Sequence, residues 1–148
     1  MGEWKATDDQ VVEIYAMFWR LMEMSVSRWG SFPSGQFLMV LTIMLLDTVD
    51  YFPTVGELAE IMRLPKSTVS RYIACQIDRG WLEEIIDPDD RRRRRLHLTS
   101  KARIEQTRHR QEVREIAEAS KQAFHGEGDS ADPVADLKNL LLRTGKQG

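Results

Sequence analysis

The sequence contains a single cysteine, Cys75, and only three histidines among its 148 residues. One cysteine excludes an intrachain disulfide and any cysteine-rich metal site. The histidines, His97, His109 and His125, lie far apart, and no group of histidines and acidic residues has the spacing of metal ligands. We therefore expect no metal site. We expect Cys75 to be a small buried helix residue, since a redox sensor needs an exposed thiol of low pKa.

Long apolar runs are also absent. The longest run, residues 37–46, is interrupted by Thr42 and is too short to cross a membrane. The first residues include Glu3, Asp8 and Asp9 and lack the basic and then apolar layout of a secretory signal. These absences predict a cytoplasmic protein with no membrane partner. The length predicts one domain with packing arms.

Positive charge is scarce except in one segment. The net charge is −2, but residues 63–110 hold thirteen lysines and arginines against seven acidic residues, a local charge of +6. The rest of the chain holds eight against sixteen, a charge of −8. A basic segment inside an acidic protein indicates where a polyanion binds.

Helical periodicity and turn residues predict four helices in the first half of the chain. Apolar residues at helical spacing predict a helix over about residues 8–28, and a second, buried one over residues 33–47. A capping box that starts at Thr54 opens a third helix through Met62. A fourth helix, residues 65–78, begins with a proline and is followed by a glycine suited to a left-handed cap.

A hairpin and two more helices follow. Residues 81–87 and 93–99 predict two strands, joined by an Asp-Pro-Asp-Asp turn. Ser100 is expected to cap a long polar helix to about residue 123, whose sparse apolar stripe requires a partner surface. A last helix is predicted from residues 132–133. The pattern predicts a mainly α protein with a small β hairpin.

One side of the fourth helix is polar. The residues of this side are Ser67, Ser70, Arg71 and Ala74. Lys66 and Thr68 lie beside them at the N-terminus of the helix. An arginine bonds guanine through two hydrogen bonds, short hydroxyl side chains reach bases or phosphates, and alanine permits close approach. The face therefore suits a DNA major groove. Periodicity alone is equally compatible with a solvated face.

The hairpin carries five consecutive arginines, residues 91–95. A charge run is usually only solvated, but like charges this close in a short hairpin repel one another unless an anion lies near. Arginine is also the residue that enters narrow minor grooves. The hairpin thus favours the DNA interpretation of the neighbouring helix.

These residues resemble the MarR (multiple antibiotic resistance regulator) family of winged-helix transcription factors. The segments that carry the resemblance are Leu58-Ala59-Glu60, Lys66-Ser67-Thr68-Val69-Ser70-Arg71, Gly80-Trp81-Leu82, Asp87-Pro88-Asp89-Asp90-Arg91-Arg92 and Leu98-Thr99. Asp90 and Arg92, followed by Leu98-Thr99, resemble the family's wing motif. The flanking helices agree in order and length, so the resemblance covers most of the chain.

The resemblance implies a winged helix-turn-helix core over residues 33–100, with dimerisation helices in residues 1–30 and 101–148. The protein would be a homodimer that binds double-stranded DNA. The residues expected to contact the major groove are Lys66, Ser67, Thr68, Ser70 and Arg71. The residues expected in the wing contact are Asp90, Arg91, Arg92 and Arg93, with Asp90 orienting Arg92 through a salt bridge.

Three positions depart from the family pattern. Arg63 stands where a glycine is usual between the third and fourth helices, so the angle of that turn is open. Pro65 replaces a usual serine cap but keeps a fixed φ. Arg94 falls on the face of Leu96 and Leu98, where an apolar residue is common, which predicts a wing that packs more loosely or binds more strongly.

Family members commonly bind small lipophilic or phenolic anions between the arms and the winged core. Apolar residues suited to such an effector pocket are Trp19, Met22, Trp29, Phe32, Phe37 and Met39. The alternative interpretation is a packed core. No other cofactor is expected, and the sequence identifies neither the effector nor the operator.

Other functions account for less of the sequence. A metal-dependent nuclease would use Asp87, Asp89 and Asp90, but the wing motif already accounts for this turn, and no catalytic motif appears elsewhere. A winged helix used only for protein contacts, or an architectural DNA binder, remains an alternative. The sequence favours a sequence-specific regulator, a repressor that a small ligand releases, and not an enzyme.

Overall fold

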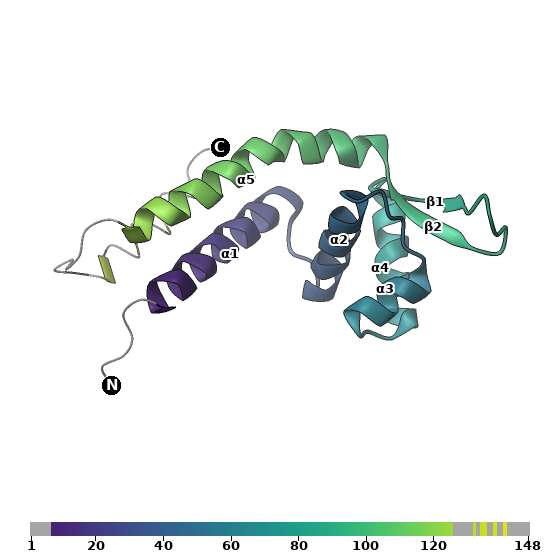
Figure 1. Cartoon of the computed structure of the whole chain (residues 1–148), viewed down its shortest axis with the longest axis horizontal. Coiled ribbons are helices and arrows are strands. Elements are labelled where there is room, and N and C mark those ends of the chain that lie inside the picture. The colour runs from purple at the N-terminus through teal and green to yellow at the C-terminus, as the bar shows by residue number, and fades with distance from the viewer. Residues whose placement is uncertain (1–6, 126–131, 133, 136–137, 139–140, 142–148) are drawn as a thin grey trace. The chain divides into compact units, whose positions relative to one another are not determined.

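A computed structural model gives the fold of the chain and describes residues 7–125, 132, 134, 135, 138 and 141. The elements in chain order are α1 (Thr7–Trp29), α2 (Ser34–Asp47), α3 (Val55–Met62), α4 (Lys66–Asp78), β1 (Leu82–Ile86), β2 (Arg94–Leu98) and α5 (Ser100–His125) (Figure 1). The described chain is mainly α with one two-stranded sheet, which confirms the predicted fold class. The helix predicted from residues 132–133 lies largely outside the described residues.

The chain divides into two compact units. Residues 32–108 form one, called the winged unit below, and residues 1–31 with 109–148 form the other, called the arm unit. The division predicted at residues 33 and 100 differs from this one along α5, whose first part lies in the winged unit.

The core of the winged unit is built by α2, α3, α4 and the sheet. Its buried apolar side chains are Met39, Ile43, Leu58, Met62, Val69, Ile73, Leu82, Leu96 and Leu98. Helix α2 contributes Met39 and Ile43, both almost completely buried. The helix was predicted to be buried, but one side of α2 is exposed at Leu38, Leu41 and Leu45.

Helix α3 begins and ends with identifiable caps. The Glu57 amide donates to the Thr54 hydroxyl at 3.3 Å, which confirms the predicted cap. Its C-cap, Arg63, is left-handed, with φ 54° and ψ 40°. The turn therefore keeps the conformation that glycine favours, with arginine in its place. Pro65 has ψ 139° and lies just before α4, so it is the N-cap and not the first helical residue.

Replacing Arg63 with glycine is expected to raise the free energy of unfolding by about 1 kcal/mol, because the left-handed region costs an L-residue roughly that amount. Chemical denaturation at a fixed protein concentration measures the change. Arg79→Gly is the matched control: Arg79 is also a C-cap but has φ −75°, so glycine there is neutral or destabilising. A lower stability for Arg63→Gly would contradict a strained turn.

The hairpin is antiparallel, with Leu82 opposite Leu98 and Glu84 opposite Leu96. Leu82, Leu96 and Leu98 are buried, whereas Arg94 is exposed although it shares their face. Arg94 lies opposite Ile86, beyond the end of the core, and its guanidinium bonds the Glu84 carboxylate at 3.1 Å. The predicted conflict between Arg94 and the packed face of the wing therefore does not arise.

The hairpin is anchored where it joins α4 and α5. Gly80, with φ 77°, confirms the left-handed residue expected after α4. Its carbonyl accepts the Thr99 hydroxyl at 2.6 Å, and Thr99 Oγ1 accepts the Ala102 amide at 3.2 Å. Thr99, rather than the expected Ser100, therefore caps α5 with its side chain.

In the arm unit, α1 confirms the predicted first helix but leaves much of its apolar stripe exposed. Its large exposed apolar residues are Val11, Val12, Ile14, Tyr15, Phe18, Trp19 and Val26. Arg28 bonds Glu112 at 3.0 Å and also contacts the buried His109 ring. No single described helix is long and apolar enough to cross a membrane; only α1 and α2, as a bent pair, meet that measure together.

Candidate nucleic-acid interface

Helix α4 presents the polar face that the sequence predicts. Ser67, Ser70, Arg71 and Ala74 are exposed, and Val69 with Ile73 is buried against the core. This alternation follows because positions three and four apart share a face of a helix. The same helix thus anchors itself with one side and offers arginine, hydroxyl and methyl groups with the other.

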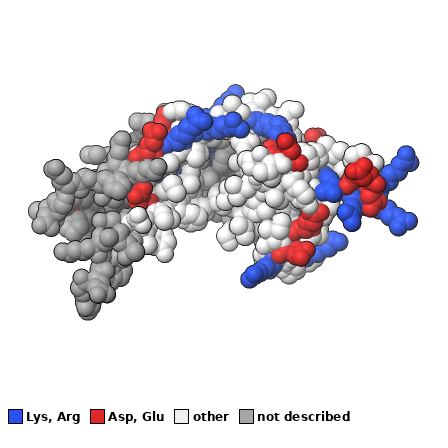
Figure 2. All heavy atoms as spheres, in the orientation of Figure 1, with Lys and Arg blue, Asp and Glu red and all other residues white. Residues whose placement is uncertain are grey.

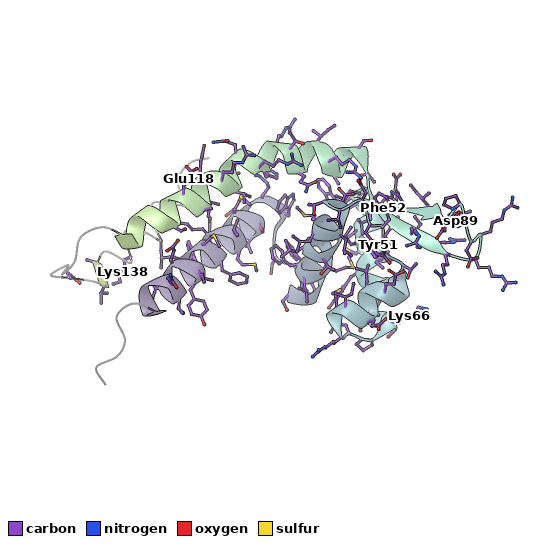
Figure 3. The ribbon with its side chains drawn as sticks, viewed as in Figure 1. Tyr51, Phe52, Lys66, Asp89, Glu118 and Lys138 are labelled. Carbon is purple, nitrogen blue, oxygen red and sulfur yellow. The ribbon has the colours of Figure 1, made fainter. Side chains whose placement is uncertain are left out.

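The start of α4 is open to an anion. Lys66 is its first residue, is exposed, and lies near the end of the helix in Figure 3. Pro65 supplies no side-chain cap, and its carbonyl accepts the amides of Thr68 and Val69 at 3.0 and 3.1 Å. The earlier amides of the first turn have no acceptor in the helix, so this end suits a phosphate. Thr68, also predicted to bind DNA, is half-buried.

The loop between the strands is held by its own acidic residues. The Asp87 amide donates to the Arg93 carbonyl at 2.9 Å and closes the hairpin. The Asp87 carboxylate accepts the Asp89 amide, and the Asp90 carboxylate accepts the Arg92 amide, at 2.9 and 3.0 Å. Figure 2 shows the result at the wing end, where blue side chains project around a group of acidic ones.

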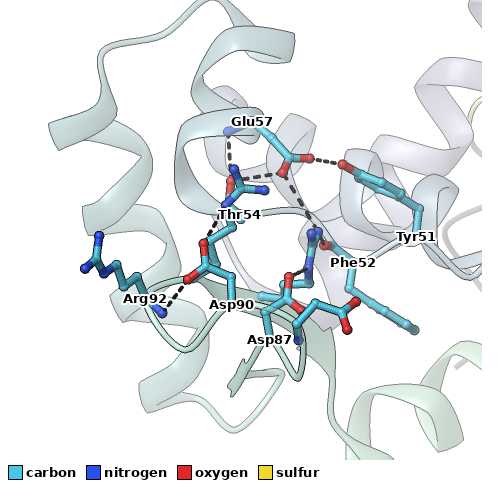
Figure 4. A network of polar contacts seen from close by, with 10 residues as sticks. Tyr51, Phe52, Thr54, Glu57, Asp87, Asp90 and Arg92 are labelled. Carbon is cyan, nitrogen blue, oxygen red and sulfur yellow. Dashed lines mark hydrogen bonds and ion pairs between the residues drawn. The ribbon is translucent and has the colours of Figure 1, made fainter.

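The carboxylate of Asp90 pairs with a different arginine from the one predicted. Its ion pair is with the Arg93 guanidinium, at 3.5 Å, and not with that of Arg92. Arg92 meets Asp90 only through its backbone amide (Figure 4). The expected salt bridge was wrong because the tight turn brings the Arg92 backbone, rather than its side chain, to the carboxylate. Arg91, Arg92 and Arg93 are all exposed.

Arg95 differs from the other four arginines. Its Nε donates to Asp87 Oδ2 at 2.7 Å, and its Nη1 donates to the Phe52 carbonyl at 2.8 Å (Figure 4). The Asp87 carboxylate accepts hydrogen bonds from the Asp89 amide and from the Arg95 guanidinium, and these two bonds lower the pKa of the Asp87 carboxyl. The bond to Asp87 in turn raises the pKa of Arg95. The pair is therefore charged at neutral pH.

The segment before α3 lies against the second strand. The Leu96 amide donates to the Pro53 carbonyl at 2.9 Å, and the His97 ring stacks on Phe52 with centroids 3.8 Å apart. Burial lowers the pKa of His97, so its ring is neutral at neutral pH. Sequence analysis missed this contact between Phe52 and the wing, because no local pattern links a loop residue to a strand more than forty positions later.

The six residues predicted for an effector pocket are distributed over both units. Trp19, Met22 and Trp29 belong to the arm unit, and Trp29 meets the His109 ring edge-on at 5.3 Å. In the winged unit, Phe32 and Phe37 stack with their centroids 5.9 Å apart. Met39 is completely buried in the core of the winged unit. The pocket itself stays a prediction.

The acidic turn and the cysteine are both occupied by protein contacts. Within the part of the chain that the structure describes, no three histidine, cysteine or acidic side chains are placed to hold a metal ion. Asp87 and Asp90, proposed above for a nuclease site, bond backbone amides and arginines instead. Cys75 is half-buried, and its sulfur accepts the Gln36 side-chain amide at 3.5 Å.

Comparison with known proteins relates this arrangement to one family. The model described as MarR family matches residues 38–93, from α2 to the wing loop. No curated protein matches the sequence.

Solved structures share the fold at low sequence identity. RV1404 from Mycobacterium tuberculosis superposes with a TM-score of 0.56 at 13% identity, covering 93% of this chain and 85% of that one. FabT from Streptococcus pneumoniae, in complex with DNA, gives 0.53 at 18%, covering 91% and 85%. The reduced form of MarR from E. coli gives 0.51 at 20%, covering 90% of each chain. The α3–α4 pair and the wing loop lie inside the segment that matches the MarR family model, and the chain shares its fold with these winged-helix structures.

Proposed function

We propose that this protein is a transcriptional regulator that binds double-stranded DNA in a sequence-specific way. The observation that carries the proposal is the pairing, within one unit, of an exposed polar face on α4 with an exposed arginine wing. The FabT structure, which has the same fold, holds DNA. A winged helix kept only for protein contacts needs neither the polar face nor the basic loop.

The two surfaces have different tasks in this proposal. Arg71, with Ser67 and Ser70, faces base edges in the major groove and supplies sequence preference. The open first turn of α4 and the side chain of Lys66 hold a phosphate. Arg91 and Arg92, whose side chains have no ion pair among the described residues, contact the backbone or the minor groove.

The protein acts as a homodimer in this proposal. The apolar residues of α1 that are exposed in the described chain, with Ile14, Tyr15 and Phe18 among them, are suited to covering by another protein surface. A second copy that covers this surface would place two α4 helices about a two-fold axis. The operator would then be a pseudo-palindrome, with half-sites about one helical turn, roughly 10 base pairs, apart.

The regulator is proposed to be a cytoplasmic repressor released by a small lipophilic or phenolic ligand. In the winged unit, the stacked rings of Phe32 and Phe37 provide apolar surface for such a ligand. A ligand shifts DNA binding only if it binds the free and DNA-bound conformations with different affinities. No residue is assigned a catalytic role.

Arg92→Ala is expected to weaken binding to all duplexes by a similar factor. The slope of the logarithm of the binding constant against the logarithm of the salt concentration should fall in magnitude by about 0.9 for each wing that contacts DNA. The reason is that fewer counterions are released from the DNA on binding when a phosphate contact is lost. Titration of a labelled duplex at several salt concentrations measures the slope. Arg108→Ala removes another exposed arginine and serves as the control. An unaltered slope in Arg92→Ala would count against a backbone or groove contact.

A further inference from the structure

We propose that Arg95 is a positioning residue that sets the angle of the wing against α3, and that it does not itself contact DNA. The inference rests on the proposed function, because its consequence is read in DNA affinity. Arg95, the last of the five consecutive arginines, would thus have a role different from that of Arg91 and Arg92.

The surroundings of Arg95 distinguish it from its neighbours in the run. Its side chain is 23% exposed, against 61% for Arg93 and 69% for Arg94. Arg93 and Arg94 each pair with one carboxylate of the wing itself, Asp90 and Glu84. Arg95 alone reaches outside the hairpin, to the Phe52 carbonyl and, at 3.8 Å, to the Glu57 carboxylate.

The two anchors of Arg95 belong to different parts of the winged unit. Asp87, whose side chain is 8% exposed, starts the wing loop and fixes it through the Asp89 amide and the Arg93 carbonyl. Glu57 lies in the first turn of α3, where its carboxylate also accepts the Thr54 and Tyr51 hydroxyls (Figure 4). Arg95 therefore joins the loop that carries the exposed arginines to the helix that precedes α4.

The same contacts make Arg95 unsuited to binding phosphate. Moving its guanidinium to DNA would leave the buried Asp87 carboxylate without its charged partner, which is strongly unfavourable. The Tyr51 ring, 5.8 Å from the guanidinium carbon, covers it from a further side. Because Arg95 stays on Asp87, the direction of Arg91 and Arg92 relative to α4 is fixed before DNA arrives. Such preorganisation lowers the cost of ordering the wing on binding.

The test measures affinity for a selected operator duplex at several salt concentrations, with Arg95→Met in the wild-type and in the Arg92→Ala background. We expect Arg95→Met to weaken binding about tenfold, the size of a lost charged hydrogen bond, and to lower the magnitude of the salt slope by no more than Arg92→Ala does. In the Arg92→Ala background the same substitution should cost less than about threefold, because one of the two contacts that Arg95 positions, that of Arg92, is already absent. Arg94→Met, the adjacent exposed arginine, is the matched control.

Two results would overturn the proposal. A further fall in the magnitude of the salt slope, by about 0.9 for each wing, when Arg95→Met is added to Arg92→Ala would mean that Arg95 contacts phosphate directly. An equal loss in both backgrounds would mean that Arg95 only supports the fold. Both differ from a failure of the proposed function, in which the wild-type protein binds no duplex at all.

Arg95→Lys keeps the test decisive if Arg95→Met does not fold, as judged by thermal unfolding. Lysine keeps the charge but has no planar fork with which to bond Asp87 and Phe52 together. We expect Arg95→Lys to lose nearly as much affinity as Arg95→Met. Affinity kept at the wild-type level would instead indicate a point charge on phosphate and would contradict the positioning role.

Discussion

Arg71→Ala is expected to remove the preference for one base pair in each half-site of the operator. The loss of discrimination at that position should be about 1–3 kcal/mol, because a well-placed arginine makes two hydrogen bonds to guanine that no other base pair offers. Affinities for the operator and for its three variants at each position, measured by competition, give this value directly.

The control for this experiment is Arg79→Ala. Arg79 is an exposed arginine at the opposite end of α4, so its loss changes net charge equally without touching the polar face. Its substitution should leave base preference unchanged at every position. If Arg71→Ala weakens binding to all sequences equally and keeps the base preference, Arg71 contacts phosphate and the assignment of the base-reading residue is wrong.

Leu58→Ala is expected to lower the free energy of unfolding by about 2–5 kcal/mol. Leu58 is completely buried in α3, at the centre of the core that supports α4 and the wing. Truncating it removes apolar contacts and leaves a cavity that neighbouring side chains fill only in part. Denaturant unfolding at a fixed protein concentration gives the change in free energy.

Ile61→Ala provides the matched control, since Ile61 lies on the same helix but is 53% exposed. Its effect should stay within about 0.5 kcal/mol. The difference between the two substitutions tests the packing of α3 independently of any DNA contact. Equal effects would mean that the two residues are equally buried, and the described orientation of α3 would be incorrect.

Local chemistry explains why most of the winged unit could be predicted. The cap at Thr54, the left-handed Gly80 and the alternation of Leu96 and Leu98 are decided by residues within a few positions of each other. Helical spacing likewise separated the exposed Ser67, Ser70 and Arg71 from the buried side of α4. Cap positions were less accurate: Thr99 replaced Ser100, and Pro65 lies one residue outside the helix.

The contacts of Arg95 could not be predicted, because they depend on residues distant in the sequence. In sequence, Arg92 and Arg95 belong to the same run of five arginines. Only the strand register and the position of the segment at Phe52 bring Arg95 to Asp87 and a backbone carbonyl. The alternation of side chains along the strand did place Arg95 on the face of the sheet away from the buried leucines. A residue on that face can equally well point into solvent.

The exposed side of α1 is a different kind of discrepancy. Periodicity identified the helix correctly, yet an apolar stripe does not reveal whether it packs within the chain or on another copy. In the described chain Ile14, Tyr15 and Phe18 are exposed. The sequence therefore predicts the existence of an interface more readily than its partner, and the homodimer stays part of the proposal.

Selection of bound fragments from a random pool of duplex DNA, at physiological salt, tests the central claim most directly. The proposed function predicts one enriched inverted repeat, with half-sites about one helical turn apart. Retention that depends on salt but enriches no motif would indicate an architectural binder that contacts only the backbone. No retention of any duplex would contradict the proposal and favour a winged helix that serves protein contacts.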